Sequence, residues 1–107
     1  MKETFFNDET VIKLGSNAKE NWKLVDSDES YTWLHLNSYP SCHVVIETDE
    51  PTQEEIIFAA QLCKENTKYR NLHNLKICYT TCGNLKKGTD VGSVVYKSKR
   101  KVKYIVV

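Results

Sequence analysis

The chain has 107 residues, of which 40% are hydrophobic and 27% are charged, and its formal net charge is +1. This composition is that of a globular domain and excludes a coiled coil, a collagen-like chain and a long disordered tail. No run approaches the roughly 18–20 apolar residues of a membrane helix, and the first residues lack the long apolar run of a signal peptide. We therefore expect a single domain over residues 1–107, no membrane contact, and a location in the cytoplasm, with the nucleus as the alternative.

The small net charge hides an uneven distribution along the chain. Residues 1–63 contain 4 lysines and 12 acidic residues, a net charge of −8, whereas residues 64–107 contain 11 basic and 2 acidic residues, a net charge of +9. A basic half of this strength favours a polyanionic partner. The alternative is that the two halves interleave in three dimensions and their charges cancel.

The first third of the chain predicts a hairpin followed by a helix. Residues 4–6 and 11–14 are short β-type runs joined by a polar turn. Asn17 can cap the helix that follows, with Glu20 three residues later as the partner in a capping box.

The middle of the chain predicts a second hairpin and a second helix. Residues 31–36 and 42–46 are rich in β-forming residues and flank five turn-type residues. Thr52 and Glu55 form another capping-box pattern, and the run that follows is so apolar that the helix should be largely buried.

The last third of the chain predicts three strands and no helix. Residues 75–80 read as a strand and residues 82–90 as a glycine-containing loop. Residues 93–97 and 102–106 predict a final hairpin with basic residues 98–101 at its tip. The order ββαββαβββ favours an α+β fold with a mainly antiparallel sheet and two helices.

Several segments, taken in order, carry the motifs of one family. They are GSNAKEN at 15–21, TWLHL at 32–36, PSCHVV at 40–45, EEIIFAAQL at 54–62 and VGSVVY at 91–96. Together they resemble the NFACT-R domain, and residues 79–92 are most similar to its small stand-alone, coiled-coil-domain-containing members. The resemblance runs from about Gly15 to the end of the chain and implies an RNA-binding module.

In larger relatives this domain belongs to ribosome-associated quality-control factors that act in translation. The resemblance therefore implies RNA as the partner, with transfer RNA, ribosomal RNA and DNA open, together with the ribosome or quality-control proteins. Two departures from the family pattern weaken the match locally. Ser16 stands where the family has a basic residue, and Ser41-Cys42 stand where it has Gly-Ser.

Two histidines give the sharpest local signal. If residues 37–41 form the turn of the hairpin, His35 lies directly opposite His43, with their Cβ atoms about 5 Å apart. The two imidazoles could bind a metal, donate to a phosphate or stack on a base. Alternatively, they could satisfy backbone carbonyls beside Trp33. Both positions match histidines of the family, which favours a ligand surface.

The predicted first helix carries three more candidates. Asn17 and Asn21 are four residues apart, so they share one face, and their amides could read a sugar or a base edge. The alternative is that one caps the helix and the other is solvated. Lys19, on an adjacent face, could contact a phosphate.

Basic residues of the second half complete the candidate nucleic-acid surface. Lys86 and Lys87 lie in the predicted glycine-flanked loop, which could approach a phosphate backbone closely. Lys97 and Arg100 belong to the predicted final hairpin, where tyrosines alternate with basic residues as in single-stranded RNA sites. The alternative is a hairpin tip whose lysines prevent pairing between sheet edges.

Neither a metal site nor an enzyme signature stands out. The four cysteines should be reduced thiols, and Cys78 and Cys82, although spaced like zinc ligands, have no second pair nearby. No nucleophile elbow, phosphate-binding loop or zinc-protease motif is present, so we expect no catalytic residue and no cofactor. The sequence predicts a nucleic-acid-binding module. The alternatives are a protein-interaction module that docks through its acidic half on a ribosomal or quality-control partner and, in third place, an enzyme.

Overall fold

The computed structural model describes all 107 residues and has an α+β fold with two helices. Six strands form one antiparallel sheet in the order β1-β2-β4-β3-β5-β8, and β6 and β7 pair separately. The strands are β1 Lys2–Phe6, β2 Thr10–Leu14, β3 Thr32–Leu36, β4 Val44–Ile46, β5 Lys76–Thr81, β6 Leu85–Lys87, β7 Val94–Tyr96 and β8 Lys103–Val106. The helices are α1 Ala18–Val25 and α2 Gln53–Glu65, and two short 3₁₀ turns are Cys82–Asn84 and Lys99–Lys101.

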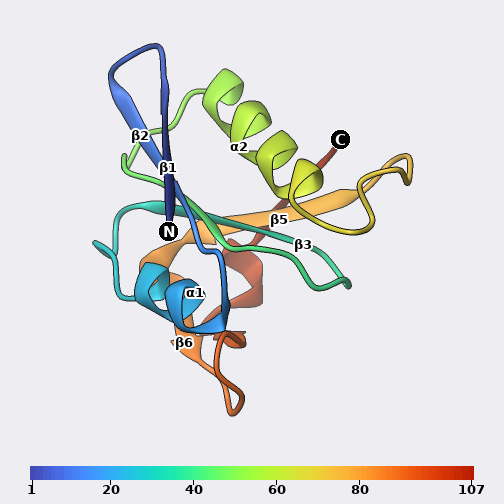
Figure 1. Cartoon of the computed structure of the whole chain (residues 1–107). Coiled ribbons are helices and arrows are strands. Elements are labelled where there is room, and N and C mark those ends of the chain that lie inside the picture. Colours follow the sequence, from blue (N-terminus) through green and yellow to red (C-terminus); the bar gives the residue numbers. More distant parts are fainter.

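Different elements cover the two faces of the large sheet, α2 on one and α1 with the small sheet on the other (Figure 1). Each face buries its own core. Because successive strand residues point to opposite faces, Leu34 and Leu36 of β3 pack beneath α2, whereas Trp33 packs on the side of α1 and the small sheet. The first core also contains Ala59 and Cys63 of α2, as the apolar run predicted. No helix of the chain is long and apolar enough to cross a membrane.

Local signals set the first hairpin and the buried helix. Asn7 and Asp8 adopt positive φ angles of 54° and 60° between β1 and β2, a conformation that Asn and Asp tolerate better than other non-glycine residues. The predicted capping box is present at α2, where the Thr52 hydroxyl accepts from the Glu55 N–H at 3.1 Å and the Glu55 carboxylate accepts from the Thr52 N–H at 2.8 Å. The hairpin and the α2 capping box are therefore confirmed.

The predicted final hairpin is wrong. β7 pairs with β6, and β8 pairs with β5, where Ile77 lies opposite Ile105. The predicted loop over residues 82–90 contains a 3₁₀ turn and β6 instead. The reason is that β8 places Ile105 on the core under α2, whereas buried Leu85 anchors β6, and with it β7, to the other core.

Candidate functional site

An open cleft of about 800 Å³ lies on the α1 side of the large sheet. Five segments distant in sequence form its walls. They are the start of β1, the β2–α1 connection with the first turns of α1, the β3–β4 hairpin, residues 66–68 just after α2, and the β6–β7 loop. Four of the predicted site residues line it, namely Asn17, Asn21, His35 and His43. The lining contains no Asp or Glu, although the first half of the chain is strongly acidic.

The two histidines face each other as the hairpin register predicts. Leu34 pairs with Val44, and one step further along the strands the rings of His35 and His43 lie 5.1 Å apart, almost perpendicular. The indole of Trp33 stacks parallel to His35 at 5.6 Å, and its Nε1 donates a hydrogen bond to His43 Nδ1 at 3.0 Å. Because Nδ1 accepts this bond, the His43 proton sits on Nε2 and the ring is neutral.

Burial keeps both imidazoles uncharged. Only 2% of His43 is exposed, and the loss of solvent, with a further contribution from neighbouring His35, lowers the pKa of His43 to about 3. Burial also lowers the pKa of His35. At neutral pH the pair therefore carries no positive charge. His35, the more exposed of the two, offers a hydrogen-bonding and stacking group that suits a base better than a phosphate.

The two asparagines each combine a structural contact with a free amide group. Asn17 Oδ1 caps α1 by accepting from the Glu20 N–H at 2.9 Å, while the Glu20 carboxylate bonds to the Ser16 N–H rather than to that of Asn17. Asn21 Oδ1 accepts from the His43 N–H at 3.2 Å. Neither side-chain NH₂ group has a partner in the structure, so both can donate into the cleft.

Gly15 allows this arrangement by leaving room for Asn21. A Cβ at Gly15 would overlap the Asn21 side-chain oxygen, and the Gly15 N–H donates to the His43 carbonyl at 3.0 Å. The absence of a side chain thus brings α1 against β2 and the start of β4, and this contact sets the floor of the cleft.

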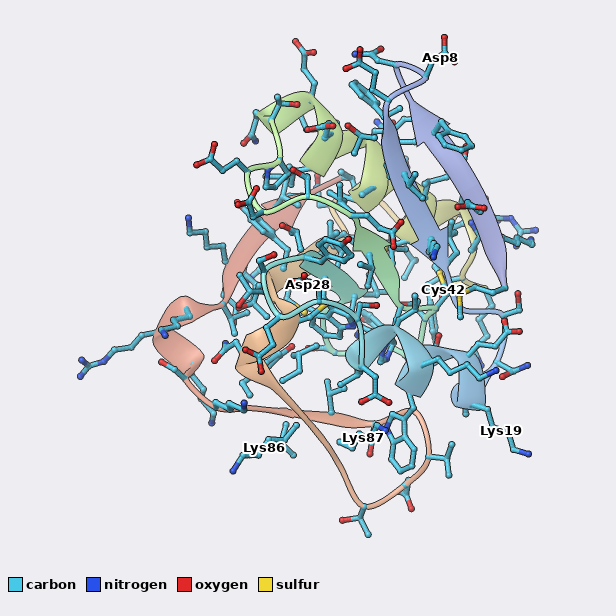
Figure 2. The ribbon with its side chains drawn as sticks, turned by 90° about the vertical axis from the view of Figure 1, so that its left-hand side faces the viewer. Asp8, Lys19, Asp28, Cys42, Lys86 and Lys87 are labelled. Carbon is cyan, nitrogen blue, oxygen red and sulfur yellow. The ribbon has the colours of Figure 1, made fainter.

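The predicted basic residues lie outside the cleft lining. All of them are exposed: Lys19 on α1, Lys86 and Lys87 on β6, Lys97 just after β7, and Arg100 in the 3₁₀ turn. Figure 2 places Lys19, Lys86 and Lys87 toward one end of the molecule, away from Asp8.

Lys86 and Lys87 differ in how free their charges are. They lie on a paired strand, not in the glycine-flanked loop that the sequence predicted. The Lys87 ammonium lies 2.7 Å from Asp26 and 5.5 Å from the centre of the Trp22 ring, so its charge is partly compensated. Lys86 has no ion pair and is the freer candidate for a phosphate contact.

The acidic and basic halves stay largely apart. The four strands of the first half, β1 to β4, are neighbours in the sheet, and β5 and β8 of the second half lie together at its other side. Of the three ion pairs in the structure, only Lys87–Asp26 joins the two halves. Interleaving is therefore limited within the large sheet. The halves do meet beside α1, where the acidic stretch 26–29 lies against the 3₁₀ turn before β6 and the Gly83 N–H donates to the Glu29 carbonyl at 2.9 Å.

Sequence reasoning missed two basic residues of the cleft. Lys2 lines it because β1 pairs with β2 in the register that sets Lys2 opposite Leu14. Lys68 lines it because the chain after α2 folds back over the β3–β4 turn. The sequence contains no local motif for either contact, since both depend on tertiary pairing.

Comparison with known proteins identifies relatives that match most of the chain. The family model described as "NFACT protein RNA binding domain" matches residues 2–99. The chain is 30% identical over 96 residues to the Rqc2 homolog RqcH of Bacillus subtilis and 28% identical over 107 residues to coiled-coil domain-containing protein 25 of Danio rerio. These matches cover 86% and 91% of this chain but only 17% and 52% of the two relatives.

A solved structure supports the same relationship. The C-terminal part of the fibronectin/fibrinogen-binding protein of Streptococcus suis superimposes with a TM-score of 0.87 at 26% sequence identity. The match covers 98% of this chain and 43% of that one. The arrangement of strands and helices that forms the cleft therefore recurs in a relative.

Proposed function

The chain belongs to the NFACT protein RNA binding domain family, and on that basis we propose that it is an RNA-binding module that acts in ribosome-associated quality control. The observation that carries the proposal is the family match over residues 2–99, which includes every segment of the cleft. We place the protein in the cytoplasm, with ribosomal RNA or transfer RNA as its partner. The proposed role is binding, not catalysis.

The proposed mechanism divides the work between the cleft and the exposed cations. In the cleft, the free NH₂ groups of Asn17 and Asn21 and the neutral His35 ring contact bases or sugars. His43 positions Asn21 through its backbone N–H and packs against the His35 ring, and Asn17 is fixed by its capping contact with Glu20. Outside the cleft, the exposed basic residues neutralise phosphates and set most of the affinity. These are Lys19, Lys86, Lys87, Lys97 and Arg100.

This division between the cleft and the exposed cations predicts that RNA affinity depends more on where the positive charges lie than on the net charge of the protein. The double variant Lys86→Gln/Arg100→Gln removes two positive charges from the proposed surface. The control Gln53→Glu/Gln61→Glu lowers the net charge equally, but on exposed positions of α2, which covers the opposite face of the sheet. Fluorescence anisotropy with labelled single-stranded RNA, duplex RNA and transfer RNA measures the affinity of both variants.

We expect the first variant to weaken binding by about tenfold or more and to flatten the log–log salt dependence by about 1.4, which is roughly 0.7 for each lost phosphate contact on a single strand. The control should bind nearly as the original chain does. An equal loss of RNA affinity in both variants would mean that net charge alone, and not the position of the basic residues, determines binding. No binding of the original chain to any RNA would favour the alternative, a protein-interaction module that docks through the acidic half.

A further inference from the structure

Tyr39 and Tyr69 form an aromatic pair beside the cleft, each next in sequence to a residue that lines it, Pro40 and Lys68. Tyr39 lies in the β3–β4 turn and Tyr69 in the connection after α2, and their ring centres are 4.6 Å apart with a tilt of 40°. Tyr69 is half-buried and packs against the core under α2, whereas 41% of Tyr39 is exposed. Tyr69 therefore supports one side of the Tyr39 ring and leaves the other side to solvent.

The pair is held in place by contacts between its two loops. The Thr67 hydroxyl donates to the Pro40 carbonyl at 3.2 Å, which ties the connection after α2 to the β3–β4 turn. Within the turn, the Ser41 hydroxyl accepts from the Leu36 N–H at 3.1 Å. A ring fixed in this way loses little conformational entropy when a ligand stacks on it.

The surroundings of the pair suit a polyanion with apolar faces. The Lys68 ammonium lies 5.3 Å from the centre of the Tyr69 ring, Lys68 also lines the cleft, and exposed Arg70 follows. Tyr39 also lines a second, smaller cleft of about 290 Å³, which shares His35 and Pro40 with the first. Neither cleft is lined by a carboxylate.

We propose that Tyr39, supported by Tyr69, is the stacking platform for an unpaired base of a single-stranded nucleic acid whose phosphates pass along Lys68 and Arg70. The inference rests on the proposed RNA-binding function and specifies its substrate as single-stranded or looped rather than duplex. Stacking of a base on an exposed aromatic ring contributes about 1–3 kcal/mol, whereas the faces of bases within a duplex are already covered by their neighbours.

Substitution at Tyr39 tests the platform, with a matched control elsewhere on the surface. Tyr39→Leu removes the ring but keeps an apolar side chain on Tyr69, and Tyr39→Phe keeps the ring without its hydroxyl. Phe5→Leu is the control because Phe5 is an exposed aromatic residue on β1, outside both clefts. Anisotropy is measured with a 12-nucleotide RNA and with a duplex, and 2-aminopurine in the single strand reports stacking directly.

Tyr39→Leu should weaken single-strand binding by about 5- to 150-fold, the factor that corresponds to one stacked base, with little effect on duplex binding. Tyr39→Phe and Phe5→Leu should stay within about twofold of the original chain, and binding to the original chain should quench 2-aminopurine. Unquenched 2-aminopurine, or a Tyr39→Leu variant that still binds the single strand fully, would overturn the platform. If Lys86→Gln/Arg100→Gln still weakened binding, the proposed function would survive that result. Failure of the original chain to bind any RNA would overturn both.

Discussion

The buried pair of His43 and Trp33 shows how single residues define the cleft. The neutral imidazole of His43 accepts a hydrogen bond from the indole N–H of Trp33, and the backbone N–H of His43 donates to the side-chain oxygen of Asn21. The hairpin spacing was enough to predict that His35 and His43 face each other. The sequence could not reveal their neutral state, because it depends on how completely the surrounding chain excludes water.

The neutral state of buried His43 makes the stability of the folded protein depend on pH. The pKa of His43 is about 3 in the folded protein and about 6.5 when unfolded, so between these values the unfolded chain binds the extra proton. The stabilising contribution of His43 to the free energy of unfolding is therefore complete above pH 6.5 and is lost as the pH falls toward 3. Burial of His35, whose pKa is also lowered, acts in the same direction.

Urea denaturation at pH 7.5 and pH 5.0 measures the effect. His43 should reduce the free energy of unfolding by about 2 kcal/mol between these two conditions, at roughly 1.4 kcal/mol per pH unit below 6.5. His43→Gln, which retains a hydrogen-bond acceptor, should show a smaller decrease. Equal pH dependence in the variant and the original chain would contradict a buried neutral His43.

At the scale of elements, α1 is positioned by one close contact. Asn21 reaches from α1 to the His43 N–H through the space that Gly15 leaves open. The sequence predicted that Asn17 caps the helix, and the structure confirms this contact. It could not predict the partner of Asn21, since that partner lies 22 residues away on another element.

The contact predicts coupling between two substitutions. Gly15→Ala should destabilise the protein by about 1–3 kcal/mol, because the new methyl group displaces the Asn21 amide and leaves the His43 N–H unpaired. In an Asn21→Ala background the same change should cost at least about 0.5 kcal/mol less. Urea denaturation of the four proteins of this double-mutant cycle checks the result, and strictly additive free energies of unfolding would rule the coupling out.

The C-terminal strands show why local patterns can mislead. Two β-type runs joined by a short basic turn predict a hairpin, and residues 93–106 follow this pattern. Each run instead pairs with an edge left open by an earlier strand, β7 with β6 and β8 with β5. The choice depends on which core each run fills, and that information is not local.

At the scale of the whole molecule, the division of charge along the chain is kept within the large sheet. The strands of the acidic half stay together, β5 and β8 of the basic half lie at the opposite side of the sheet, and a single ion pair joins the halves. The composition of each half was readable from the sequence. The sequence could not predict a cleft without carboxylates, because Lys2, Lys68 and the polar residues that line it come together only through tertiary pairing.

The proposed function requires that the exposed basic residues outside the cleft bind RNA chiefly through its phosphates. The most direct test is an anisotropy titration of the original chain with single-stranded RNA at several salt concentrations between 50 and 200 mM. Five phosphate contacts, at Lys19, Lys86, Lys87, Lys97 and Arg100, predict that the logarithm of the binding constant falls linearly with the logarithm of the salt concentration, with a slope at least as steep as about −3.5. If the folded protein does not bind, or if salt leaves its affinity unchanged, binding through phosphates is ruled out.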